Sequence, residues 1–256
     1  MFKEVDRNMH FVIGSPLVPW KVERGEHLAW LENVQGIKKT FPNVKFFAAL
    51  ELDHRPLEES YGSFLHELKS IDADYWTYSL NDWEEEVTYS NRWIRIEMGR
   101  NLIREFAQRL RRTSGWEWGG DTDPYNQGII NYQAILYVDS DMIVDATMIE
   151  KMMEIDRPVV SVDVPAYGLK GKMINQNPRI EEHWNTAGML WVNAPYFYDL
   201  PWYHNNYMNL SDDPTFQHLL ERLYGQTWVR KDIQAKHKGQ LVGVEKRNIP
   251  NRKVRD

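Results

Sequence analysis

The chain has 256 residues, and its 31 basic and 37 acidic side chains give a formal net charge of −6. A chain of this length can bury one sizeable core, and its acidic balance argues against a dedicated nucleic-acid-binding protein, although a local basic patch could still hold a nucleic acid. The sequence contains no cysteine, which excludes disulfides, thiolate metal sites and a cysteine nucleophile.

The N-terminal residues 1–7 are charged and lack the apolar stretch of a signal peptide. No window of the sequence has the length and apolar character of a membrane span. We therefore expect a cytoplasmic protein without a transmembrane segment.

The first third of the chain alternates between strand-like and helix-like segments. Apolar positions at helical spacing predict helices over residues 25–40 and 57–70. Runs of β-branched and aromatic residues predict strands over residues 9–14 (stopped by Ser15-Pro16), 44–53 and 74–80. This order is typical of a parallel sheet covered by helices.

The clearest helix is expected over residues 92–112, where apolar residues recur at every fourth position. Further along, the patterns predict a strand over residues 134–138, a helix over 146–155, and strands over 158–164 and 188–193. We expect these elements to form one domain.

An acidic pair, Asp139 and Asp141, follows the apolar run Ala134–Val138. Alternate residues on an extended backbone project to the same side, so both carboxylates could reach one divalent cation that also binds phosphate oxygens. That arrangement suits the binding and departure of a nucleoside diphosphate. The alternative is a strand-end turn that caps the following helix.

Two other pairs have the same spacing. Asp72 and Asp74 precede the run Tyr75–Tyr78 and so lie where a predicted strand begins, whereas ligands of open α/β sheets bind at the carboxyl ends of strands. Asp121 and Asp123 lie in a glycine-rich segment that favours a turn. Only the pair at Asp139 and Asp141 is therefore expected to be functional.

From residue 9 to 239 the chain resembles the GT-A-fold nucleotide-sugar glycosyltransferases. The resemblance rests on Phe11–Pro16, Gly99-Arg100-Asn101, Tyr137–Met142 and Thr186–Asn193. It implies a GT-A-like, Rossmann-type α/β fold, with a mostly parallel sheet flanked by helices in a single domain with an irregular C-terminal lobe. The implied parts are a nucleotide-sugar-binding half over about 9–145, an acceptor and catalytic half over about 146–239, and a basic tail over 240–256.

The resemblance also implies roles for particular residues. Asp213 or Asp212 would act as catalytic base, although an acidic residue before Pro214 is also a good helix start. The other implied residues are metal ligands (Asp139, Asp141 and His237), donor-binding residues (Pro16, Glu51, Asp53, Asp82, Arg100 and Ser140) and acceptor-binding residues (Trp184, Asn185, Thr186 and Gly188). The acids at 51 and 53 depart from the pattern common among inverting members, and residues 114–131 form an unusually long insertion.

The function implied is transfer of a sugar from a UDP- or GDP-sugar to an acceptor hydroxyl group. The reaction would need Mn²⁺ or Mg²⁺ and would invert the anomeric centre, with Asp213 as the base. One alternative is a sugar nucleotidyltransferase, although Gly14-Ser15-Pro16-Leu17 lacks the glycine-rich phosphate loop of that class. Another is a non-catalytic binding protein with a degenerate fold. The acceptor is undefined. A nucleic acid with a modified base could bind the basic segment 231–255, which could equally be a solvated tail.

Overall fold

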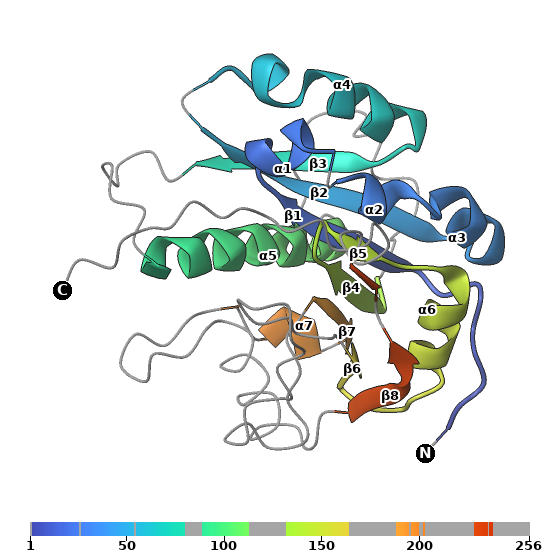
Figure 1. The fold of residues 1–256 in the computed structure, drawn as a ribbon. Helices are drawn as coiled ribbons and strands as arrows, with labels where there is room; N and C mark the ends of the chain where they lie inside the picture. The colour runs from blue at the N-terminus through green and yellow to red at the C-terminus, as the bar shows by residue number, and fades with distance from the viewer. Residues whose placement is uncertain are drawn as a thin grey trace, which may run out of the picture.

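The computed structural model describes residues 2–25, 27–53, 55–79, 89–112, 132–163, 188–194, 196–199, 202, 228–234 and 236–237. Its main sheet has the strand order β3-β2-β1-β4-β7-β6-β8, and β7 alone runs antiparallel to its two neighbours (Figure 1). The strands are β1 (Phe11–Leu17), β2 (Val44–Leu52), β3 (Asp74–Ser79), β4 (Ala134–Val138), β6 (Val159–Asp163), β7 (Met189–Asn193) and β8 (Trp228–Gln234). The prediction of a mostly parallel sheet is confirmed.

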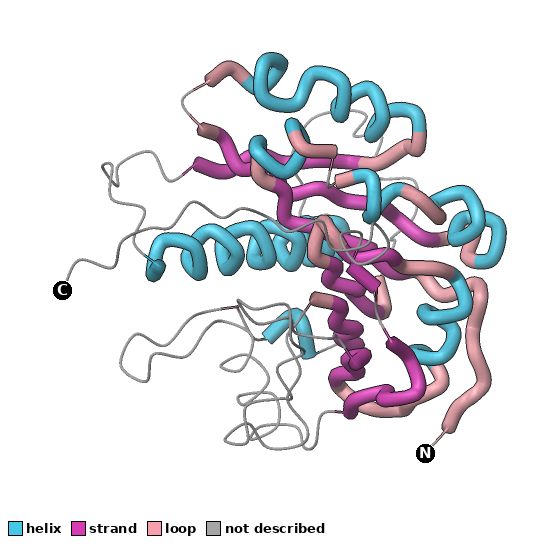
Figure 2. Tube along the Cα trace, viewed as in Figure 1, coloured by secondary structure: helices cyan, strands magenta, loops and turns pink. Residues whose placement is uncertain are grey.

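Helices flank this sheet (Figure 2). They are α1 (Pro19–Glu23), α2 (Leu28–Leu31), α3 (Val34–Thr40), α4 (Leu57–Ser70), α5 (Tyr89–Arg112), α6 (Ala146–Met153) and α7 (Tyr196–Asp199). A second small sheet pairs β5 (Met142–Ile143) with β9 (Lys236–His237). Within the described ranges, no helix combines the length and apolar character that a membrane crossing needs.

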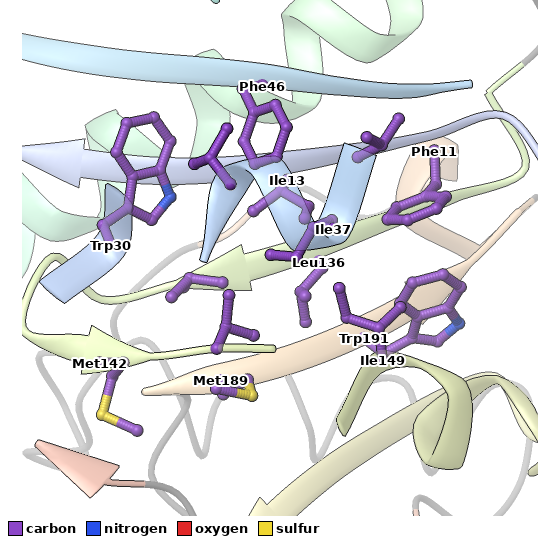
Figure 3. Close-up of a cluster of buried hydrophobic side chains, with 14 of the residues drawn as sticks. Phe11, Ile13, Trp30, Ile37, Phe46, Leu136, Met142, Ile149, Met189 and Trp191 are labelled. Atoms are coloured by element: carbon purple, nitrogen blue, oxygen red, sulfur yellow. The ribbon is translucent and has the colours of Figure 1, made fainter. Parts of the chain in front are cut away.

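Side chains alternate between the two faces of the sheet and build one apolar core on each face. The larger core lies beneath α1 to α4 and α6, and Figure 3 shows part of it. There the ring of Phe11 meets that of Phe41 edge-on at 5.4 Å and that of Trp191 at 5.2 Å. The other core lies beneath α5 and α7.

Two glycines allow α5 to lie directly against β1. A Cβ atom on Gly99 of α5 would lie 2.7 Å from Cβ of Pro16, and a Cβ atom on Gly14 would collide with Ile103 of α5. Because α5 and β1 approach so closely, the position of Arg100 relative to the sheet is set by backbone packing.

Two predictions about the first elements are wrong. β1 does not stop at Ser15-Pro16 but continues to Leu17. Pro16 is tolerated because β4 pairs with β1 only as far as Gly14, so the last part of β1 needs hydrogen bonds on one side only.

The helix expected over residues 25–40 is divided into α2 and α3. Asn33, between them, has φ −113° and ψ 13°, and its side-chain amide donates a 3.0 Å hydrogen bond to the carbonyl oxygen of Val144. A contact with a distant part of the chain thus outweighs the local helical pattern.

Candidate functional site

The acidic pair lies in a tight turn immediately after β4. The N–H of Met142 donates to the carbonyl oxygen of Asp139 at 2.9 Å, which closes the turn, and the N–H of Asp139 donates to the carbonyl oxygen of Gly188 at 2.9 Å. The expectation that Asp139 and Asp141 project from one extended strand is therefore wrong, because β4 ends at Val138. The turn leaves both carboxylates about one-third exposed.

The turn is not the cap of the helix that follows. Asp145 occupies that position, and its carboxylate accepts a 2.8 Å hydrogen bond from the N–H of Met148 in the first turn of α6. Capping therefore does not account for Asp139 and Asp141.

Each aspartate faces a different cation. Arg100 Nη2 lies 3.3 Å from Oδ1 of Asp139, and Lys21 Nζ lies 3.6 Å from Oδ2 of Asp141. Arg100 comes from α5, on one face of the sheet, and Lys21 from α1, which follows β1. Two carboxylates and two cations thus meet at the carboxyl edge of the sheet.

Arg100 is held much more firmly than a surface arginine. Its side chain is 2% exposed, and its guanidinium carbon lies 4.5 Å from the ring centre of Trp202. Asn101, the next residue, holds the backbone of Trp202 through two hydrogen bonds of 2.8 Å. This stacking and pairing keep a permanent positive charge next to Asp139.

The small sheet brings a further predicted ligand near the turn. In the antiparallel pair of β5 and β9, His237 lies opposite Met142, the residue after Asp141. The backbones of His237 and the acidic turn are therefore neighbours across one strand spacing. The imidazole lies outside what the structure describes, so its role as a metal ligand stays a prediction.

Both acids at the end of β2 are paired with arginines. Glu51 is 5% exposed, and its Oε1 lies 3.3 Å from Nε of Arg95. Burial raises the pKa of the Glu51 carboxyl, and Arg95 opposes this effect. Asp53 accepts hydrogen bonds from the side chain and backbone N–H of Arg55, and the side-chain bonds contribute most to a pKa lowered to about 2. These contacts give both acids a structural role, and their roles in donor binding remain predictions.

The remaining described candidates lie close to the turn or to α5. Pro16 packs against Gly99 of α5, and Gly188 accepts the hydrogen bond from Asp139. The Ser140 hydroxyl is buried and has no hydrogen-bond partner among the described residues. The other candidates, Asp82, Trp184, Asn185, Thr186, Asp212 and Asp213, lie outside the described residues.

Two partly exposed carboxylates suit a hard divalent cation, which prefers oxygen ligands and keeps some of its positions for water or phosphate oxygens. In the described part of the chain, no group of three or more His, Asp or Glu side chains is placed to hold a metal. A third His, Asp or Glu ligand would therefore come from a side chain that the structure does not describe, and His237 is the predicted one.

The competing pair at Asp72 and Asp74 has a structural role at the opposite edge of the sheet. Lys45 Nζ lies 3.6 Å from Oδ2 of Asp72 and 3.3 Å from Oδ2 of Asp74, at the start of β3. The third pair, Asp121 and Asp123, lies outside the described residues.

Lys21 is the site residue that sequence reasoning missed. It follows β1 by four residues, and a basic residue just after the first strand of an α/β sheet is a usable signal for the carboxyl edge. That signal is weak, because the sequence alone does not show that Lys21 reaches a residue 120 positions further along.

No known family model and no curated protein sequence matches this chain. Among solved structures, the fold is similar to that of the mannosyltransferase PcManGT from Pyrobaculum calidifontis, solved in complex with GDP-Man and Mn²⁺, with a TM-score of 0.51 and 7% identity. The match covers 92% of this chain and 59% of that one, so this chain spans less than two-thirds of the length of PcManGT. A second match is the mannosyltransferase Ktr4p from S. cerevisiae, with a TM-score of 0.30 and 13% identity. It covers 63% of this chain and 41% of that one, and it is too weak to support an inference. At these identities the likeness establishes the fold alone, and it confirms the expected glycosyltransferase-like α/β architecture.

Proposed function

We propose that this protein is a metal-dependent glycosyltransferase that transfers a sugar from a nucleoside-diphosphate sugar to an acceptor hydroxyl group. One observation carries the proposal: Asp139 and Asp141 lie in a partly exposed turn at the carboxyl end of β4, between Arg100 and Lys21. This combination of paired carboxylates and flanking cations is suited to a diphosphate and its counter-ion.

The topology of the sheet supports this location for a nucleotide. The chain passes from β1 to β2 and β3 on one side, then returns to place β4 on the other side of β1. In open α/β sheets, ligands bind at such a switch point, outside the carboxyl ends of the two diverging strands. Here α1 with Lys21 follows β1, and the acidic turn follows β4, so charged residues come after both diverging strands.

The donor is proposed to be a UDP- or GDP-sugar. The similar fold of PcManGT, whose structure contains GDP-Man and Mn²⁺, makes GDP-mannose the first donor to test. Pro16, Asp82 and Ser140 are the other proposed donor contacts, and Glu51 and Asp53 would contribute only if their arginine pairs are rearranged.

The residues have distinct proposed roles in the transfer. Arg100 holds Asp139 and places positive charge at the departing diphosphate. When bound by Asp139, Asp141 and His237, Mn²⁺ or Mg²⁺ supplies further charge neutralisation at the same group. Asp213, with Asp212 as the alternative, takes the proton of the acceptor hydroxyl in an inverting reaction.

The acceptor is proposed to lie beside the start of β7, where Trp184, Asn185, Thr186 and Gly188 occur in sequence. A screen of acceptor pools by mass spectrometry, including glycans, proteins and DNA with modified bases, would identify it.

The first experiment measures binding by thermal shift. GDP or UDP at about 100 times its Kd should stabilise the wild-type protein by about 2.7 kcal/mol, and only when Mn²⁺ is present. Asp141→Asn should lose this Mn²⁺-dependent stabilisation without unfolding. Asp74→Asn is the matched control, because it changes the other described Asp-x-Asp pair at the far edge of the sheet and should behave as wild type.

The second experiment tests the reaction itself. Incubation with a panel of nucleotide sugars and Mn²⁺ should release a nucleoside diphosphate from one donor, whereas a nucleotidyltransferase would instead form pyrophosphate from a nucleoside triphosphate and a sugar phosphate. If Asp141→Asn retains Mn²⁺-dependent binding of GDP and UDP, or if wild type shows none, the proposal fails.

A further inference from the structure

Three properties together distinguish Lys21 from the proposed donor-binding residues that the structure describes. Its ammonium group lies 3.6 Å from Asp141, which is an ion-pair distance but too long for a hydrogen bond. Its side chain is 20% exposed, so it borders solvent. Its backbone is fixed, because α1 is anchored by buried Pro19 and Val22 on either side of it.

The two cations at the turn therefore differ in freedom. Arg100 is almost completely buried and stacked on Trp202, so its charge is stationary. Lys21 carries a compact charge on a flexible four-carbon stem and can exchange one partner for another within reach. A partly exposed ion pair at this distance is weak, so exchange costs little.

The charges of the turn predict when the exchange occurs. Asp139 and Asp141 are balanced by Arg100 and Lys21, so a divalent cation that binds Asp141 meets the positive charge of Lys21. A nucleoside diphosphate that arrives with the cation brings negative charge to the same place and offers Lys21 a new partner.

We propose that Lys21 is a phosphate-binding residue of the donor site, which pairs with Asp141 in the free protein and moves to the diphosphate when metal and nucleotide bind together. This inference rests on the proposed function. It makes binding of the cation and of the nucleotide mutually dependent, because the cation releases Lys21 from Asp141 for the diphosphate, and the diphosphate draws Lys21 away from the cation.

Removing the charge of Lys21 should have two effects of opposite sign. Without nucleotide, Lys21→Gln should bind Mn²⁺ about tenfold more tightly, since one unit charge a few ångströms from a divalent ion changes its affinity by roughly that factor in a site open to water. With saturating Mn²⁺, the same variant should bind GDP or UDP about tenfold more weakly, because a charge-assisted contact with phosphate is lost.

Two variants serve as controls. Arg24→Gln removes the same charge a few residues away, where the guanidinium lies over the ring of Trp20 at 5.0 Å, and should change neither affinity. Lys21→Arg keeps the positive charge and should restore both affinities toward wild type. Mn²⁺ binding alone is measured by electron paramagnetic resonance of free Mn²⁺, and GDP and UDP binding by calorimetry.

The inference is supported only if Lys21→Gln binds Mn²⁺ more tightly and the nucleotide more weakly, and Arg24→Gln shows neither change in affinity. An unchanged affinity for Mn²⁺ or for the nucleotide in Lys21→Gln, or equal shifts in Arg24→Gln, overturns it. If wild type binds nucleotide with Mn²⁺ while Lys21→Gln binds both as wild type does, the inference fails and the proposed function stands. If wild type binds neither GDP nor UDP under any metal condition, the proposed function fails and the inference fails with it.

Discussion

Gly99→Ala is expected to separate α5 from β1 and to weaken the site through Arg100. The added Cβ would lie 2.7 Å from Cβ of Pro16 and 3.1 Å from the hydroxyl of Tyr78. The proline ring is part of β1 and cannot swing aside, and the Tyr78 hydroxyl is held by a 3.1 Å hydrogen bond to the carbonyl oxygen of Arg95. The helix itself must therefore move.

Gly62→Ala is the matched control. Gly62 lies in helix α4, and a Cβ atom on it would meet nothing within 4 Å. Both substitutions gain up to about 1 kcal/mol of helix propensity, and this gain cancels in the comparison. The difference isolates the collision, which should cost Gly99→Ala about 1–3 kcal/mol relative to Gly62→Ala. For a domain of this size that corresponds to roughly 3–9 °C in Tm.

The assay combines urea denaturation with nucleotide binding in the presence of Mn²⁺. Gly99→Ala should be the less stable variant and should bind GDP or UDP more weakly, because Arg100 follows Gly99 and is displaced from Asp139. Gly62→Ala should bind as wild type does. Equal stability of the two variants would refute the close contact between α5 and β1, and equal binding would refute its control of Arg100.

Three further outcomes are expected. Asp53→Asn should lower the free energy of unfolding at neutral pH by only about 1 kcal/mol, because water screens the partly exposed ion pair between Asp53 and Arg55. Since the pKa of the Asp53 carboxyl is lowered in the folded protein, this contribution is present above pH 4 and disappears as the pH falls toward 2. Denaturation at both ends of that pH range would measure it. His237→Ala should raise the Mn²⁺ concentration for half-maximal activity about tenfold or more and weaken the preference for Mn²⁺ over Mg²⁺; a metal titration with an unchanged midpoint would exclude ligation. Asp213→Asn should lower kcat by roughly 10²-fold or more with little change in donor affinity; loss of stability alone would identify a helix cap instead.

The most accurate expectations concerned elements whose pattern is local. The helix expected over residues 57–70 and the strand over 134–138 match α4 and β4 to the residue. Helical spacing of apolar residues identifies the first segment, and a short apolar run of β-forming residues identifies the second. In both, the partner of the apolar surface can be any other apolar surface.

The acidic pair was recognisable, but its geometry was not. The apolar strand before Asp139 correctly placed the pair at the carboxyl edge of the sheet. The turn that presents the carboxylates depends on the carbonyl oxygen of Gly188, which directly precedes β7, and no local pattern predicts such a bond.

The sequence by itself determined the order of most strands and helices up to β7, the mostly parallel character of the sheet and the position of the acidic pair along the chain, because these follow from periodicity and strand ends. Only the tertiary structure decided that Arg100 and Lys21 become the partners of Asp139 and Asp141, that His237 lies opposite Met142, and that Asn33 interrupts a helix. Each of these contacts joins residues far apart in the chain. Whether two such side chains meet depends on the distance between them, which is set by the packing of α5 on β1 and by the pairing of neighbouring strands.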